Sequence, residues 1–116
     1  MIRTQNIEVF VVTYDRPDYL ERQLESLVNQ TMWPKSVIVL DDGPNPKTRE
    51  VCHRFPSELV SYVRSDRPGL WGNIYEAQQR ASAPYTAIFH DDDRIHPRYI
   101  EIAARVLAAH PEVTLL

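Results

Sequence analysis

Short apolar runs alternate along the chain with segments in which apolar residues recur every three or four positions. The runs are rich in β-branched residues and too short for helices, so each predicts a buried strand. The periodic segments between them predict amphipathic helices. We expect strands at residues 7–13, 37–40, 59–63 and 85–89, and the start of a fifth strand at 113–116.

Prolines mark the boundaries of the expected helices. Pro17 fits the first turn of one helix and Pro97 the first turn of another, while Pro34 and Pro111 follow helix ends. Residues 66–72 contain two of the three glycines and are expected to form a loop. The expected helices carry apolar faces made of Leu20, Leu24, Leu27 and Val28; Val51, Cys52 and Phe55; Ile74, Ala77 and Ala81; and Tyr99, Ile102, Ala103, Val106 and Leu107.

Strict alternation of strand and helix predicts the fold class, which is α/β with a mostly parallel twisted sheet flanked by helices on both faces. At 116 residues the chain is expected to form a single domain. In such sheets, ligands bind outside the carboxyl ends of the strands. The residues that follow each strand are therefore the first place to look for a binding site.

Polar residues stand at the carboxyl ends of three expected strands. They are Thr13-Tyr14-Asp15, Asp41-Asp42-Gly43 and His90-Asp91-Asp92-Asp93. Adjacent carboxylates repel one another, so the last group suggests a compensating divalent cation with an anionic ligand. An acidic, solvated turn is the alternative for that group alone. Because neighbouring strands would bring all three groups to one edge of the sheet, we favour a binding site.

Charge and cysteine content narrow the possible functions. The formal net charge of −3 gives no basic excess, so a nucleic-acid partner is not expected. The single cysteine, Cys52, excludes an internal disulfide and a Cys-rich zinc site, and it is expected to be a buried, inert thiol in a reducing compartment. Without a visible signal peptide or membrane span, we expect a cytoplasmic location, or a place at the inner face of a membrane.

Four segments together resemble the nucleotide-sugar-binding half of family 2 glycosyltransferases, which have the GT-A fold. They are Val-Val-Thr-Tyr-Asp-Arg-Pro-Asp-Tyr-Leu, Ser-Leu-Val-Asn-Gln-Thr, Val-Leu-Asp-Asp-Gly and Ile-Phe-His-Asp-Asp-Asp-Arg-Ile-His-Pro. The resemblance covers nearly the whole chain in order and spacing. It implies that residues 1–116 form a GT-A half-domain that binds a nucleoside diphosphate sugar, most simply a UDP-sugar. The implied reaction is metal-dependent glycosyl transfer to a saccharide or another hydroxyl acceptor.

The resemblance also implies roles for individual residues. Tyr14 would stack on the nucleotide base, Asp42 would accept a hydrogen bond from a ring N–H, and Thr13 would lie beside them. Asp91 would face the ribose or the phosphates.

Asp92 and Asp93, in the family's DXD motif, would bind Mn²⁺ or Mg²⁺. The family often has an acid where this chain has His90, so the cation would use either His90 or carboxylates alone; a His ligand suits Mn²⁺ better than Mg²⁺.

Family domains are longer than this chain, and their acceptor-binding half and catalytic base follow the metal motif. The resemblance therefore places the base beyond Leu116 and names no catalytic residue here. We expect a truncated donor half that transfers no sugar alone and that self-associates through uncovered apolar edges. A non-catalytic nucleotide-sugar-binding or interaction module of the same fold is the alternative function.

Four further residues have local interpretations. Trp71 would either line the donor pocket or be a partly exposed packing residue. Asp15 and Arg16 are expected to be turn and helix-start residues, and His96 is expected to be a local surface or capping residue.

Overall fold

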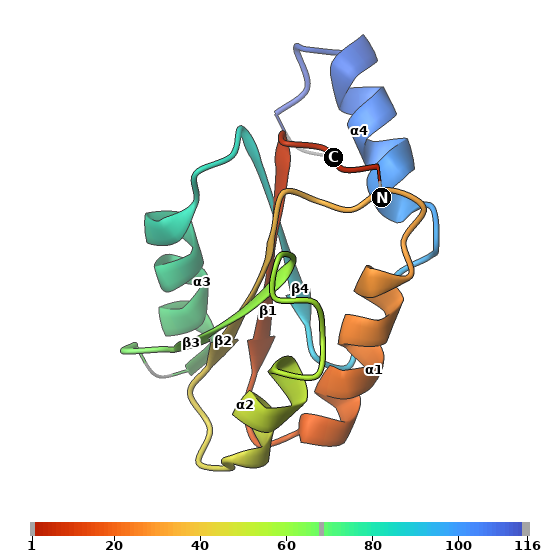
Figure 1. Ribbon diagram of the computed structural model, residues 1–116. Helices are drawn as coiled ribbons and strands as arrows, with labels where there is room; N and C mark the ends of the chain where they lie inside the picture. The colour runs from red at the N-terminus through yellow and green to blue at the C-terminus, as the bar shows by residue number, and fades with distance from the viewer. Residues whose placement is uncertain (1, 68, 115–116) are drawn as a thin grey trace.

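The computed structural model describes residues 2–67 and 69–114. Strands and helices alternate along the chain, as the sequence predicts (Figure 1). The elements are β1 (Ile7–Thr13), α1 (Pro17–Val28), β2 (Val37–Asp41), α2 (Lys47–Cys52), β3 (Val60–Arg64), α3 (Gly69–Arg80), β4 (Tyr85–His90) and α4 (Tyr99–Ala109). Among the described residues, no helix is long and apolar enough to cross a membrane.

The strands form one parallel sheet in the order β3-β2-β1-β4, which confirms the predicted α/β class. The chain adds β2 and β3 on one side of β1 and then returns to place β4 on the other side. The carboxyl ends of β1 and β4 therefore flank the point where the strand order reverses, the usual ligand crevice of open α/β sheets. The register sets Thr13 opposite Asp41 and Val12 opposite His90, so the predicted strand-end residues share one edge.

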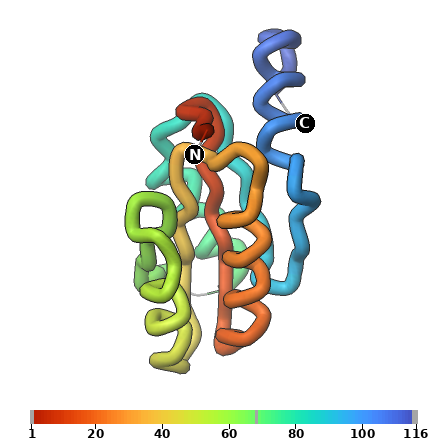
Figure 2. Tube along the Cα trace, turned by 45° about the vertical axis from the view of Figure 1, so that its right-hand side comes forward, coloured from red at the N-terminus to blue at the C-terminus, as the bar shows by residue number. Residues whose placement is uncertain are grey.

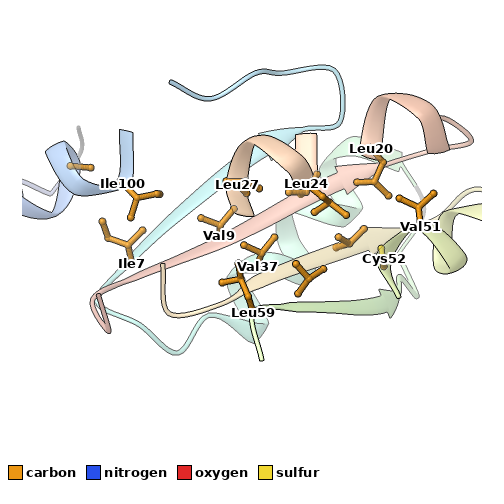
Figure 3. Close-up of a cluster of buried hydrophobic side chains, with 14 residues drawn as sticks. Ile7, Val9, Leu20, Leu24, Leu27, Val37, Val51, Cys52, Leu59 and Ile100 are labelled. Carbon is orange, nitrogen blue, oxygen red and sulfur yellow. The ribbon is translucent and has the colours of Figure 1, made fainter. Parts of the chain in front are cut away.

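The larger hydrophobic core lies between the sheet and α1, α2 and α4. Alternate residues of β1 and β2, such as Ile7, Val9 and Val37, share this core with Leu24 of α1 and Ile100 of α4 (Figure 3). All seven residues of β1 are buried because this central strand is covered on both faces. Cys52 lies in the same core, and burial, followed by the charge of Asp41, raises the pKa of its thiol to about 12.

Among the described elements, α3 is the one helix that covers the opposite face of the sheet (Figure 1). Its buried cluster contains Phe10, Leu40 and Ala77. In Figure 2, α4 stands beyond the other elements, at the end of the molecule where the N-terminus lies. The sheet thus has a thick layer on one face and a thin layer on the other.

The structure corrects several predicted boundaries. Helix α3 begins at Gly69, so residues 69–72 are not part of the predicted loop. Position 72 of this helix has room only for glycine, because a Cβ there would lie 2.6 Å from the carbonyl oxygen of Arg67. Strand β3 is shifted by one residue toward the C-terminus, and α2 ends at Cys52 instead of Phe55. Val113 and Thr114 form no strand, and the rest of that predicted strand lies outside the described residues.

Candidate functional site

The adjacent acids at the end of β2 point to opposite faces of the sheet, as successive strand residues must. Asp41 faces the larger core and is 1% exposed. Its Oδ1 accepts the N–H of Gly43 at 2.8 Å, and its Oδ2 accepts the hydroxyl of Tyr62 at 2.7 Å. Burial, and next this hydrogen bond, raises the pKa of Tyr62. Asp41 therefore holds the turn after β2, and its burial keeps it from a ligand.

Asp42 faces the side of the sheet that α3 covers. Its Oδ2 accepts the N–H of Gly69 at 2.6 Å, and its Oδ1 accepts a hydrogen bond from Nδ2 of Asn73 at 3.3 Å. The side chain is only half-buried, and it borders a hollow. Of the two acids, Asp42 is thus the one placed to meet a ligand.

This hollow, which we call the rim pocket, measures about 560 Å³ and lies at the carboxyl edge of the sheet. Its lining comes from the ends of β1, β2 and β4 and from the start of α3: Val12, Thr13, Tyr14, Arg16, Asp42, Gly69, Leu70, Asn73 and His90. Four of the sequence-predicted residues, Thr13, Tyr14, Asp42 and His90, meet here. Tyr14 is 59% exposed and lines the pocket, so it is accessible to a flat ligand there.

The three acids after β4 point in three directions. Asp91 is 1% exposed, and its Oδ2 accepts the hydroxyl of Thr13 at 2.8 Å. Asp92 is 51% exposed at the edge of the sheet. Asp93 turns back, and its Oδ2 accepts the N–H of His90 at 2.9 Å. These acids link the ends of β4 and β1 and leave one carboxylate open.

Arg16 lies over this acid cluster. Its Nη2 is 3.0 Å from Oδ1 of Asp91, and its Nη1 is 3.8 Å from Oδ2 of Asp92. Arg16 does precede α1, as predicted, but it makes no side-chain capping bond; its guanidinium reaches across to β4 instead. The preceding turn has Asp15 in the left-handed region at φ 53°, and its backbone packs closely on Gly43, where a Cβ would lie 2.5 Å from the Asp15 nitrogen.

Comparison with known proteins decides the family. The sequence profile described as "Glycosyl transferase family 2" matches residues 8–115. The chain belongs to this family. It is 28% identical over 104 residues to glycosyltransferase GlyA of Streptococcus pneumoniae, a match that covers 87% of this chain but 15% of GlyA. The chain thus spans a small part of that relative.

Solved glycosyltransferases have the same fold. Residues 1–349 of Staphylococcus aureus TarS, in complex with UDP-GlcNAc, match with a TM-score of 0.74 and 27% identity over 92% of this chain and 32% of that one. The mannosyltransferase PcManGT of Pyrobaculum calidifontis, in complex with GDP-Man and Mn²⁺, matches with a TM-score of 0.74 and 21% identity over 89% of this chain and 32% of that one. The predicted GT-A architecture is therefore confirmed.

The acids of this family 2 chain do not form a closed metal cage. Among the described residues, no three His, Cys, Asp or Glu side chains group where they could hold a metal ion. Magnesium in proteins is commonly bound by one or two carboxylates, with substrate phosphates and waters as the other ligands. The half-exposed Asp92 fits this mode, since it leaves room for ligands that come with the substrate.

Sequence reasoning missed two polar residues of the rim pocket, Arg16 and Asn73. Neither stands in an acidic or strand-end group, and only the placement of β4 beside β1 brings Arg16 to Asp91. Trp71 matches neither predicted role, because it lies on α3 with 80% exposure and does not line the rim pocket. His96 is a local residue as predicted, since its Nδ1 accepts the N–H of Arg98.

Proposed function

We propose that this chain is the donor-binding part of a metal-dependent glycosyltransferase. A nucleoside diphosphate sugar would bind with its base in the rim pocket and its diphosphate toward Asp91 and Asp92. The observation that carries the proposal is the meeting of Tyr14, Asp42 and the β4 acids along one edge of the sheet. TarS, the similar protein described above, binds UDP-GlcNAc.

The polar groups around Asp42 match the edge of uracil. That edge carries one N–H donor between two carbonyl acceptors. A carboxylate oxygen of Asp42 would accept the donor with a lone pair that the N–H of Gly69 and the Nδ2 of Asn73 leave free. The exposed ring of Tyr14 would stack on the base, with Thr13 next to it. A UDP-sugar is therefore the proposed donor.

The diphosphate would lie over the acid cluster. Asp92 is the proposed ligand of a divalent cation, Mn²⁺ or Mg²⁺, with His90 and Asp93 as its neighbours. The cation, when bound, neutralises the negative charge that develops on the leaving nucleoside diphosphate. Asp91 would stay on the ribose and phosphate side, held there by Thr13. The glycosyl group would pass to a hydroxyl acceptor such as a saccharide.

Calorimetric titration with UDP, with and without Mn²⁺, tests the proposal. Without the cation the diphosphate meets three carboxylates, and like charges near a protein surface repel by a few kcal/mol, on the order of 4 kcal/mol at contact. We expect UDP to bind at least about tenfold more weakly without Mn²⁺. Asp92→Asn should abolish most of the gain from Mn²⁺.

Glu58→Gln is the matched control. It also removes one exposed negative charge, but it lies just before β3, at the amino end of the sheet, far from the rim pocket. Its UDP affinity should equal that of the unaltered chain. Equal UDP affinity with and without Mn²⁺, together with an unchanged affinity in Asp92→Asn, would refute the metal-dependent donor site.

A further inference from the structure

Arg16 is the cationic side chain in contact with the acid cluster, and it also lines the rim pocket. A divalent cation bound at Asp92 would therefore lie close to a guanidinium. We infer that Arg16 binds the donor's diphosphate and, because its positive charge competes with the cation for Asp92, makes cation binding depend on the nucleotide. This inference rests on the proposed function.

The geometry of the ion pair leaves Arg16 able to move. Oδ1 of Asp91 lies 3.0 Å from the guanidinium, yet it accepts no well-aligned hydrogen bond, so the contact is one of charge alone. The Arg16 side chain is 47% exposed, and its 3.8 Å pair with Asp92, which is 51% exposed, is of the weak surface kind. Arginine has five N–H donors in a planar fork that matches two phosphate oxygens at once. Most of these donors remain available to a phosphate.

The surroundings of Arg16 allow its guanidinium to move toward a phosphate. The ring of Tyr19 lies 5.8 Å from the guanidinium carbon and offers a flat surface along which the group can slide. Arg16 also lines the rim pocket, where Tyr14 and Asp42 would hold the nucleoside. A diphosphate leading from that pocket to Asp92 would pass Arg16.

Electrostatics then couples the two ligands. Without a nucleotide, the cation must displace the Arg16 guanidinium or bind close to it, and the repulsion between the two positive charges weakens cation binding. A diphosphate placed between the cation and Arg16 attracts both and removes the repulsion. The coupling is reciprocal, so the cation strengthens nucleotide binding by the same factor as the nucleotide strengthens cation binding.

Arg16→Gln tests the inference through binding alone. In this variant Mn²⁺ by itself should bind several-fold more tightly than to the unaltered chain, because the competing charge is gone. UDP in saturating Mn²⁺ should bind more weakly, by roughly 5- to 150-fold, the range of typical coupling energies. Calorimetry measures UDP binding, and the paramagnetic resonance signal of free Mn²⁺ measures Mn²⁺ binding.

Arg22→Gln is the matched control. Arg22 lies on α1, the helix that follows Arg16, 6.0 Å from the same Tyr19 ring, and forms no ion pair with a described residue. Its removal changes the net charge equally, so it should leave both affinities unchanged. Arg16→Lys should keep the weak binding of Mn²⁺ alone, because the charge stays, and lose part of the UDP affinity, because the fork is gone.

The outcomes separate this inference from the proposed function. If the unaltered chain binds no UDP in any condition, the donor site itself is refuted. If it binds UDP with Mn²⁺ and Arg16→Gln behaves like Arg22→Gln in both titrations, only the role of Arg16 is refuted. Thermal melts of each variant show whether it is folded, and Arg16→Lys decides the matter should Arg16→Gln not fold.

Discussion

Substituting each of the two adjacent acids at the end of β2 should give opposite phenotypes. Asp41→Ala removes the acceptor of the Gly43 N–H and of the Tyr62 hydroxyl. A buried polar group without a partner costs about 1–3 kcal/mol. Gly43 is buried and Tyr62 half-buried, so we estimate a loss of about 2–4 kcal/mol in the free energy of unfolding. The contact with Arg64, 3.7 Å away and 57% exposed, adds little.

Asp42→Ala should instead spare the fold and damage binding. The exposed Gly69 N–H can turn to water, so the free energy of unfolding should fall by about 1 kcal/mol or less. The base loses its acceptor, which should weaken UDP binding by about 1–3 kcal/mol, or roughly 5- to 150-fold.

Thermal unfolding and UDP calorimetry on both variants measure the contrast. The melting temperature of Asp41→Ala should fall by on the order of 10 °C, and that of Asp42→Ala by much less. Asp41→Asn keeps one oxygen for the Gly43 N–H and should lose less stability than Asp41→Ala. If Asp41→Ala stays stable but loses UDP affinity, or if Asp42→Ala binds UDP normally, the assignment of the two acids is wrong.

Two more predictions concern stability and assembly. The N–H of Asp66 donates to Glu76 at 3.1 Å and is the main cause that lowers the pKa of Glu76 in the folded chain. The Glu76 carboxylate therefore stabilises the fold at pH values above its unfolded pKa of about 4.5. This contribution is lost as the pH falls through the lowered pKa of the folded chain. Glu76→Gln should therefore be less stable at neutral pH and lose less stability on acidification, as urea titrations at several pH values would show; equal pH dependence would contradict this. Strand β4 is an edge strand beside a hollow of about 390 Å³ whose lining includes Phe89 and Leu107. Light scattering should therefore detect self-association that Thr86→Lys, a charge on this edge, reduces; a monomer at micromolar concentration would contradict this.

Most of the fold follows from the sequence because the apolar pattern is unambiguous in the central elements. The run at β1 and the spacing of Leu20, Leu24 and Leu27 leave little choice between strand and helix. The start of α3 was missed because glycine usually interrupts a helix. At Gly72 the carbonyl oxygen of Arg67 comes too close for a Cβ, a contact that the apolar pattern does not reveal.

The position of the site could be predicted from the sequence, but many of its side-chain contacts could not. Parallel strands bring their carboxyl ends together, so strand-end residues such as Tyr14 and Asp42 could be expected to meet. The partners of each acid depend on which face it takes and on which loops lie over it. The contacts of Asp42 with Asn73 and of Asp91 with Arg16 are therefore seen only in the structure.

The unequal thickness of the two helix layers has a consequence for local unfolding. Helix α3 is anchored by a small cluster that contains Phe10, Leu40 and Ala77, whereas the other face has a far larger core. Elements with few buried apolar contacts open more readily than the rest of a domain. Because α3 supplies Gly69 and Asn73 to the rim pocket, the layer that holds the base would also be the layer that opens first. A bound nucleotide would then add packing contacts to α3, and donor binding would stabilise the part of the fold that unfolds most readily.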